Sequence, residues 1–390
     1  NLSICGYYCN FAANMRVRLF VIFSVLSLSV SAMEQTDTVA SAPARKGIIS
    51  RIINYFSESN RSYPTKKFDF SVIGGPHYSS DSKFGVGLMG AGLYRTSEGD
   101  SLTVSIYADA TTAGHFKVGV CGTHIFPGDR QRLTYDVNFS RIATRFWGIG
   151  YEECRDDNNE TKYNYLNSQV RVNYRWRLGN HFYLGPLAAV DYIKANDITR
   201  PELWHGEASH TFNLGVGALM EYDSRDNLSN AFHGTFLRVE QQFNPRFLGN
   251  KYAFSSTKIH ASHYSPLWKG AILAATADCV FTYGDTPWGL LSTFGGSYNM
   301  RGYFEGRYRD KSAITACVEL RQHIWHRNGI TLWGGAGTVF SKFSEITSRS
   351  VLPNYGIGYR WEFKQRVNVR LDLGFGRGTT GFIFSINEAF

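Results

Sequence analysis

The chain has 390 residues, a formal net charge of +9, 39 glycines and 15% aromatic residues. This length accommodates one large domain or two smaller ones. The basic residues are scattered, with no Lys/Arg run and no nucleic-acid-binding motif, so the charge does not indicate a nucleic-acid partner. Phe and Tyr dominate the aromatic residues, and both suit pleated, half-buried surfaces.

The first 67 residues carry processing signals rather than a fold. We interpret Met15 as the true start, so residues 1–14 are upstream sequence translated in frame. Residues 15–32 have the basic start, short apolar run and small-residue end of a signal peptide, and the run is too short for a membrane helix. Residues 33–67 read as a linker with a short amphipathic helix, which we expect to pack on the body of the protein rather than on a membrane surface.

The mature chain holds four widely spaced cysteines, and their spacing does not match a metal site. His, Cys and acidic residues likewise form no cluster with metal-ligand spacing. We therefore expect no metal and no cofactor.

From residue 68 to residue 390 the dominant pattern is alternation with a period of two. In 367–375, for example, Val and Leu residues alternate with polar ones such as Arg370 and Asp372. Turn residues divide this region into sixteen candidate strands, from 68–78 to 380–390, with the fifth at 131–141. An even number of strands is typical of a single-chain outer-membrane barrel.

The polar face of these strands separates two all-β architectures. A soluble sandwich would expose its strand charges to water, whereas a membrane barrel turns them into a wet lumen where opposite charges pair. The abundance of strand arginines and acids, together with the signal peptide, favours a 16-stranded antiparallel transmembrane β-barrel over residues 68–390. Aromatic residues near strand ends would then form interfacial girdles, among them Tyr94, Phe146, Trp147, Trp268, Tyr283, Trp288 and Trp325.

The last segment adds a targeting signature. Phe382, Phe384 and the terminal Phe390 lie on an alternating strand that ends the chain. Such an ending looks like the C-terminal recognition signal of outer-membrane barrels. We expect Phe390 to act in biogenesis rather than in the finished barrel.

The segment 295–310 is a long loop with three arginines and four aromatic residues. Long loops without regular structure are uncommon in compact domains and are usually functional. The alternative is a solvated hairpin tip with a chance cluster of arginines.

Two motifs resemble the BamA/TamA (bacterial surface antigen) superfamily. The turn that begins at Tyr222 resembles the family's Asp-Thr-Arg-Asp-Asn…Gly turn, and the segment 300–303, Met-Arg-Gly-Tyr, resembles its Val-Arg-Gly-Tyr/Phe loop tip. The matching residues of the turn are Asp223, Arg225, Asp226, Asn227 and Gly234. The resemblance covers residues 68–390.

The resemblance implies that the loop folds back into the lumen and that Arg301 pairs with an acid on the barrel wall. A guanidinium suits this role because it stays charged and binds a carboxylate through two bonds. Gly296 and Gly302 allow the tight turns, and Tyr303 packs against the wall. The family's usual acid position is occupied here by Gly335, so Glu319 and Asp372 are the candidate partners.

The resemblance also implies an outer-membrane location in a gram-negative bacterium and a role in protein assembly or translocation. The expected partners are outer-membrane lipid, nascent outer-membrane proteins and periplasmic assembly proteins. Family members that insert or export proteins carry POTRA domains, and the stretch between Ala32 and Phe68 has no room for one. The alternative is a passive pore or structural barrel that keeps only the family fold.

A barrel hydrolase is the third candidate function. His260, His263 and Ser265 fall on one predicted strand, but Gly-x-Ser-x-Gly is absent and no Ser/His/acid set stands at a characteristic spacing. We therefore expect no catalytic residues and no enzyme activity.

Overall fold

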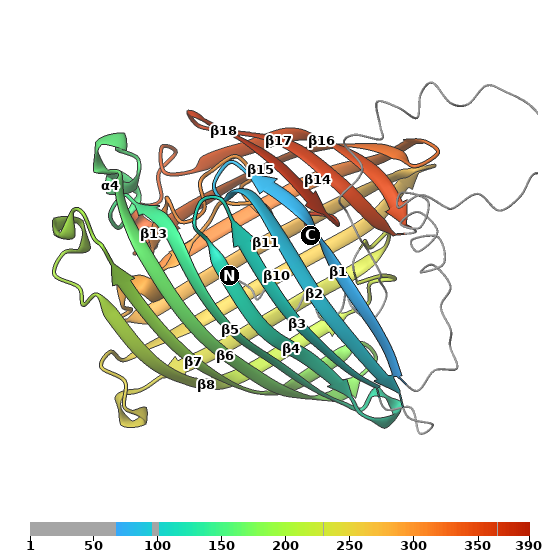
Figure 1. The fold of residues 1–390 in the computed structure, drawn as a ribbon, viewed down its shortest axis with the longest axis horizontal. Helices are drawn as coiled ribbons and strands as arrows, with labels where there is room; N and C mark the ends of the chain where they lie inside the picture. Colours follow the sequence, from blue (N-terminus) through green and yellow to red (C-terminus); the bar gives the residue numbers. More distant parts are fainter. Residues whose placement is uncertain (1–67, 96–100, 229, 365) are drawn as a thin grey trace, which may run out of the picture.

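The computed structural model describes residues 68–95, 101–228, 230–364 and 366–390. Within them, sixteen antiparallel strands form one closed barrel in the order β1-β18-β17-β16-β15-β14-β11-β10-β9-β8-β7-β6-β5-β4-β3-β2 (Figure 1). This confirms the predicted fold class. The predicted signal peptide, linker and amphipathic helix lie outside the described residues.

The barrel strands are β1 (Phe68–Ser79), β2 (Lys83–Arg95), β3 (Ser101–Thr111), β4 (Phe116–Ile125), β5 (Gln131–Phe146), β6 (Thr161–Gly179), β7 (Phe182–Asn196), β8 (His210–Asp223), β9 (Gly234–Asn244), β10 (Phe254–Trp268), β11 (Ala271–Gly284), β14 (Ser312–Trp325), β15 (Asn328–Phe340), β16 (Leu352–Lys364), β17 (Val367–Gly376) and β18 (Thr379–Ile386). The connections hold the strand pair β12 (Ser292–Thr293) and β13 (Arg309–Asp310), the helix α4 (Tyr151–Cys154) and the 3-10 helices η1 (Pro127–Asp129), η2 (Asp157–Asn159), η3 (Pro201–Trp204), η4 (Arg246–Leu248), η5 (Trp288–Leu290) and η6 (Phe343–Glu345). No helix in the described part of the chain has the length and hydropathy needed to cross a membrane.

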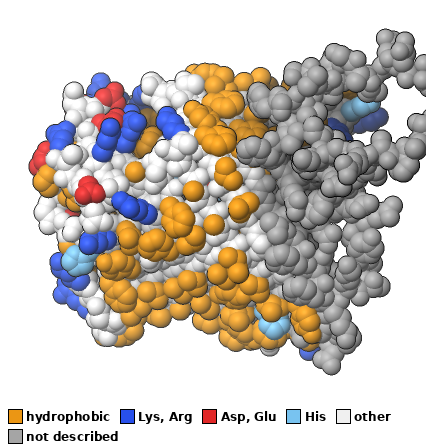
Figure 2. Space-filling view, in the orientation of Figure 1, with side chains coloured by type: hydrophobic (Ala, Val, Ile, Leu, Met, Phe, Trp, Pro, Cys, Tyr) orange, Lys and Arg blue, Asp and Glu red, His pale blue; other side chains and the backbone are white. Residues whose placement is uncertain are grey.

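Alternation along each strand gives the barrel an apolar outside and a charged inside. On β14, Val318 is 48% exposed while its neighbour Glu319 is fully buried. Figure 2 shows hydrophobic side chains over much of the outer face, with Lys and Arg gathered toward the end that carries α4. The longest connections also lie at this end, which we call the long-loop end. Because outer-membrane barrels have short periplasmic turns and long extracellular loops, the opposite, short-turn end faces the periplasm.

The predicted and observed strands differ most at two places. Strand β5 continues to Phe146, beyond the predicted end at 141. The last strand was predicted to run to residue 390 but ends at Ile386. There Asn387 adopts a left-handed conformation with φ 72°, and residues 387–390, here called the tail, turn into the lumen, where Glu388, Ala389 and Phe390 are buried.

The barrel closes through an unusually short ladder between its first and last strands. β1 pairs with β2 along its whole length, but with β18 only at Tyr78↔Phe384 and Ser79↔Ile383. The segment of β1 from Phe68 to His77 therefore has no ladder on the β18 side, although the barrel is closed at its long-loop end. We call this junction the seam.

An aromatic cluster fills part of the long-loop end. Phe146, Tyr163, Trp204 and Trp288 pack with ring centroids 4.1–6.4 Å apart. The girdle prediction is wrong for Phe146, Trp147 and Trp288, which are buried because the loops fold inward over the lumen. It fits Tyr94, Trp268, Tyr283 and Trp325, whose side chains are exposed.

Candidate functional site

The loop 295–310 lies against the inner wall formed by β14 to β18. Gly295 and Gly296 have φ values of 109° and 93°, in the left-handed region that favours glycine. Their backbone bends the chain back on itself, and the Gly296 amide donates to the Tyr303 carbonyl at 3.0 Å. Arg370 of β17 donates to the Ser297 carbonyl at 2.8 Å, which fixes this part of the loop to the wall.

Arg301 contacts both of the acids named as alternative partners. Its Nη1 donates to Asp372 Oδ2 at 2.7 Å, and its Nη2 donates to Glu319 Oε2 at 2.6 Å. The side chain is fully buried, and its guanidinium stacks on the Trp333 ring at 3.6 Å. One cation thus joins β14 to β17 across the inner wall. The role of this contact in function stays a prediction.

The two carboxylates are shared with other arginines of the wall. Glu319 also accepts from Arg321 at 2.7 Å, and Asp372 also accepts from Arg360 at 2.5 Å. Arg360 in turn binds Glu388 of the tail at 2.7 Å. Loop and tail therefore belong to one buried ionic network, in which Glu319, Asp372 and Glu388 are each paired with at least one arginine. Such sharing offsets the cost of removing these charges from water.

Glycines allow the loop backbone to reach the strands. Gly302 has φ 110°, and a Cβ on it would come within 2.8 Å of the Gly374 backbone. A Cβ on Gly374 would lie 2.4 Å from the Arg301 carbonyl oxygen, and one on Gly381 would lie 2.9 Å from Gly302 Cα. The loop tip therefore packs directly on the backbones of β17 and β18, beside the seam.

Tyr303 completes the contact with the wall. Its hydroxyl donates to the Pro353 carbonyl and accepts from the Arg377 amide, each at 2.7 Å. Its ring lies over Gly376, where a Cβ would come within 2.4 Å.

The predicted family turn lies between β8 and β9 at the short-turn end. Arg225 makes two bonds to Asp223, at 2.9 and 2.8 Å. Asp226 accepts from the Phe232 and His233 amides and pairs with Arg366 at 2.9 Å. Burial raises the pKa of Asp226, but these hydrogen bonds and the Arg366 charge outweigh it and hold the pKa below its usual value.

Asn227 and Gly234 shape the same turn. The Asn227 side chain accepts from the Asn230 amide at 3.0 Å. Gly234 has φ 111°, and a Cβ there would lie 2.4 Å from the Ser224 carbonyl oxygen. Because Arg366 belongs to the β16–β17 turn, its pairing with Asp226 connects the β8–β9 turn to the β16–β17 turn across the barrel opening.

The three C-terminal phenylalanines lie in different surroundings. Phe382 is exposed on the outer face of β18, Phe384 pairs with Tyr78 at the seam, and Phe390 is buried in the lumen. The Phe390 carboxyl-end oxygen accepts from Arg321 at 2.7 Å, and its ring packs with Tyr264 and Trp333. Phe390 is therefore packed inside the finished barrel; its role in biogenesis stays a prediction.

Three residues of this site were absent from the predicted set. Trp333 stacks on Arg301, Asn354 donates to the Arg301 carbonyl, and Glu388 binds Arg360. Strand alternation places the side chains of Trp333 and Asn354 on the lumenal face, so their orientation could be predicted from the sequence. The contact of Glu388 was not, because it depends on the inward turn of the tail.

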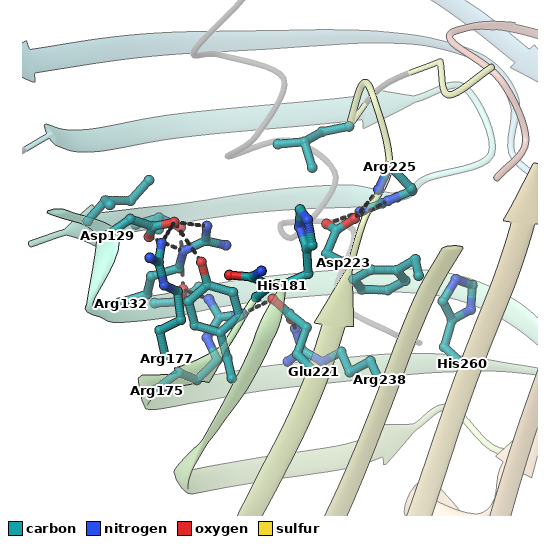
Figure 3. Close-up of a pocket in the computed structure, with 17 residues that line it drawn as sticks. Asp129, Arg132, Arg175, Arg177, His181, Glu221, Asp223, Arg225, Arg238 and His260 are labelled. Carbon is teal, nitrogen blue, oxygen red and sulfur yellow. Dashed lines mark hydrogen bonds and ion pairs between the residues drawn. The ribbon is translucent and has the colours of Figure 1, made fainter. Parts of the chain in front are cut away.

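The other half of the lumen contains a cavity of about 450 Å³ at the short-turn end (Figure 3). Five arginines and three carboxylates are among its lining residues: Arg132, Arg175, Arg177, Arg225, Arg238, Asp129, Glu221 and Asp223. The wall is therefore cationic. Among the described residues, no group of three or more His, Cys, Asp or Glu is placed to hold a metal ion.

The closed sixteen-stranded barrel, its apolar outer face and its inward-bound loop define an outer-membrane β-barrel of a gram-negative bacterium. The chain belongs to the Omp85 superfamily, since the model of the Omp85 superfamily domain matches residues 98–390. This confirms the family resemblance.

Solved structures of the same fold agree with this assignment. BamA from Haemophilus ducreyi lacking POTRA domains 1–3 is 12% identical, with a TM-score of 0.58 over 82% of this chain and 70% of that chain. CdiB from Acinetobacter baumannii is 12% identical, with a TM-score of 0.53 over 83% of this chain and 60% of that chain. CdiB from Escherichia coli is 10% identical, with a TM-score of 0.54 over 83% and 64%. At such identities the likeness shows the fold alone, and this chain spans less than two thirds of either CdiB. Among curated protein sequences, none matches the chain.

Proposed function

We propose that this barrel assembles or translocates outer-membrane proteins, with the seam as the place where a client strand adds. The observation that carries the proposal is the two-pair ladder between β1 and β18. An unpaired strand edge presents a row of N–H and C=O groups that another strand can pair with.

The position of the loop supports this role. Its tip packs on Gly374 and Gly381, and Thr379 of β18 donates to the Gly302 carbonyl at 2.7 Å. The loop is therefore bonded to the strand that forms one side of the seam. Movement of either element changes the contacts of the other.

The proposed partners follow from the same geometry. Outer-membrane lipid surrounds the apolar face, and a nascent outer-membrane protein supplies the strand that adds to β1. Periplasmic assembly proteins would deliver that client to the short-turn end.

A disulfide across the seam tests the proposal. Tyr78 and Phe384 are direct Cα partners, so Tyr78→Cys with Phe384→Cys should lock β1 to β18 under oxidising conditions. The barrel is reconstituted in liposomes, together with its periplasmic partners, and given a urea-unfolded eight-stranded barrel as client. Protease-resistant folded client is then measured with and without reductant.

The matched control places the same disulfide between Leu88 and Ala108, which are partners on β2 and β3. The seam disulfide should reduce client folding several-fold and reductant should restore it, while the control disulfide should leave it unchanged. Full activity of the oxidised seam variant would refute the proposal.

A further inference from the structure

Two neighbouring strands place a serine, a histidine and an aspartate in one hydrogen-bonded chain. His260 and Ser262 are two residues apart on β10, so both side chains face the lumen. Asp278 on β11 is the direct partner of His260 in the sheet register. Ser262 Oγ lies 3.1 Å from His260 Nε2, and His260 Nδ1 lies 2.6 Å from Asp278 Oδ1.

These contacts define a direction for proton transfer. An ionised Asp278 only accepts hydrogen bonds, so the Nδ1 of neutral His260 carries the proton and donates it to the carboxylate. The Nε2 lone pair then accepts the hydrogen bond of the Ser262 hydroxyl. A nucleophile bonded to a base, which a third group orients, is the arrangement that activates serine for acyl transfer.

Neighbouring side chains hold these three residues in place. Asn299, next to the loop tip, has its Nδ2 3.5 Å from the second oxygen of Asp278. Thr276 Oγ1 lies 3.2 Å from Ser262 Oγ and donates to the Ala261 carbonyl, also at 3.2 Å. The loop that binds the wall through Arg301 therefore also touches the acid of this set.

We propose that Ser262, His260 and Asp278 form an acyl-transfer centre that hydrolyses carboxylic esters bearing an anionic group. Of the three residues, only His260 lines the cationic cavity of Figure 3, at whose edge it is labelled; Ser262 is buried behind it, 3.1 Å from its Nε2. Each of the five arginines in the lining is paired with one of its three carboxylates, and the excess of cations that remains favours a negatively charged substrate. This activity is independent of client assembly at the seam.

The reaction needs only the ester and water. Ser262 Oγ attacks the carbonyl carbon while His260 Nε2 takes the hydroxyl proton, and the Thr276 hydroxyl exchanges its bond to the Ala261 carbonyl for one to the developing oxyanion. His260 returns the proton to the leaving alkoxide, the C–O bond breaks, and the alcohol departs from the acylated serine. Water then attacks the acyl group with His260 again taking a proton, which passes to Ser262 as the carboxylic acid leaves.

A fluorophosphonate probe tests the nucleophile on the full chain, folded in detergent. Mass spectrometry should find the probe on Ser262, and Ser262→Ala should abolish labelling. Asp278→Asn keeps the shape of the acid but loses its charge, and should slow labelling at least tenfold. Ser256→Ala is the matched control, because Ser256 is another buried, lumen-facing serine of β10. It should leave the rate unchanged.

Heat-modified electrophoretic mobility verifies that each variant is folded. The substrate class is tested with two nitrophenyl esters that differ only in whether the acyl chain ends in a carboxylate. The charged ester should react faster in the wild type, and Ser262→Ala should remove the difference. Labelling of the wild type no faster than that of folded Ser262→Ala or Asp278→Asn would overturn the proposed centre. Equal rates on the two esters would overturn the proposed substrate class.

Discussion

Arg301 is bound by two carboxylates on different strands, so its removal leaves Glu319 and Asp372 with fewer cations in a buried place. Breaking a buried ion pair costs about 3–5 kcal/mol. Arg301→Ala should therefore lower the heat-unfolding midpoint of the barrel and make the loop accessible to protease. Arg301→Lys should recover only part of this loss, because an ammonium does not make two planar bonds or stack on Trp333 in the same way.

Arg155→Ala is the control for Arg301→Ala. Arg155 is half exposed at the long-loop end and pairs with Glu152 at 2.8 Å. Surface pairs of this kind contribute about 0–1 kcal/mol. An equal loss of stability in both variants would contradict the special role of Arg301.

Gly374 gives a second test at the level of one residue. A Cβ there would lie 2.4 Å from the Arg301 carbonyl, although the strand backbone itself accommodates alanine. Gly374→Ala should displace the loop and destabilise the barrel by about 1–3 kcal/mol, as overpacking does. Gly334→Ala on β15 is the control, since a Cβ there meets no atom within 4 Å. Gly374→Ala should have a clearly lower thermal unfolding midpoint than Gly334→Ala. Equal midpoints would contradict the close contact between Gly374 and the Arg301 carbonyl.

At the scale of elements, the loop is also bound to the β1–β2 turn. Asp81 Oδ2 accepts from the Glu305 amide at 2.8 Å. Burial raises the pKa of Asp81 to about 6, and the Glu305 charge adds to this, while the hydrogen bond from the Glu305 amide opposes it. A protonated Asp81 carboxyl is therefore favoured in the state in which the loop is bound to the turn.

This preference sets the pH dependence of the contact. Its stabilising contribution is complete below the ordinary pKa of 3.8 and is lost as the pH rises through about 6. Hydrogen exchange of the Glu305 amide, corrected for intrinsic rates, should therefore show weaker protection at pH 8 than at pH 5. Asp81→Asn should flatten this profile, because the amide oxygen still accepts the bond but does not titrate. A profile that stays the same in the variant would contradict the assignment to Asp81.

Substitutions in the tail can separate targeting to the outer membrane from the stability of the folded barrel. Phe390→Ala should lower both the amount of barrel in the outer membrane and the stability of the extracted barrel, since a buried aromatic side chain contributes about 3–5 kcal/mol. Glu388→Gln keeps the terminal phenylalanine but weakens the pair with Arg360, so it should lower stability and leave targeting unchanged. Quantitative immunoblots of outer membranes and unfolding of the purified proteins measure the two effects. Unchanged membrane levels of Phe390→Ala would count against the recognition signal.

The strands were predictable because lipid imposes alternation on each of them, as on β17, where Arg370 and Asp372 had to face inward. The inward turn at Asn387 was not predictable, since alternation continues formally to Phe390. In the lumen the tail is bound by contacts between distant parts of the chain, such as the pairing of Glu388 with Arg360. For the same reason the sequence left two partners open for Arg301, and the structure shows a guanidinium shared between both.

The Ser262–His260–Asp278 set could not be predicted from the sequence for a different reason. Its members fall on two strands, and only the β10–β11 register brings Asp278 opposite His260. Sequence inspection singled out Ser265 instead, which lies three residues beyond Ser262. Because neighbouring side chains of a strand point to opposite faces, Ser262 shares the lumenal face of His260 and Ser265 does not.

At the scale of the whole molecule, one side of the lumen is filled by protein and the other side holds a cavity. The loop and tail occupy the wall from β14 to β18, and the cationic cavity lies on the side of β4 to β10. At the long-loop end, the cluster of Phe146, Tyr163, Trp204 and Trp288 packs over the lumen. A barrel filled in this way differs from an open pore, and the difference is measurable as ion conductance.

In planar bilayers the wild type should show low, fluctuating conductance, whereas a passive pore would show stable open channels. Trp288→Ala should raise the conductance several-fold, because it removes a fully buried ring that contacts Phe146, Tyr163 and Trp204. Trp268→Ala is the matched control, since this ring is exposed at the short-turn end of β10 and should leave conductance unchanged. Large and stable wild-type channels, insensitive to Trp288→Ala, would favour the passive pore over an assembly barrel closed in its resting state.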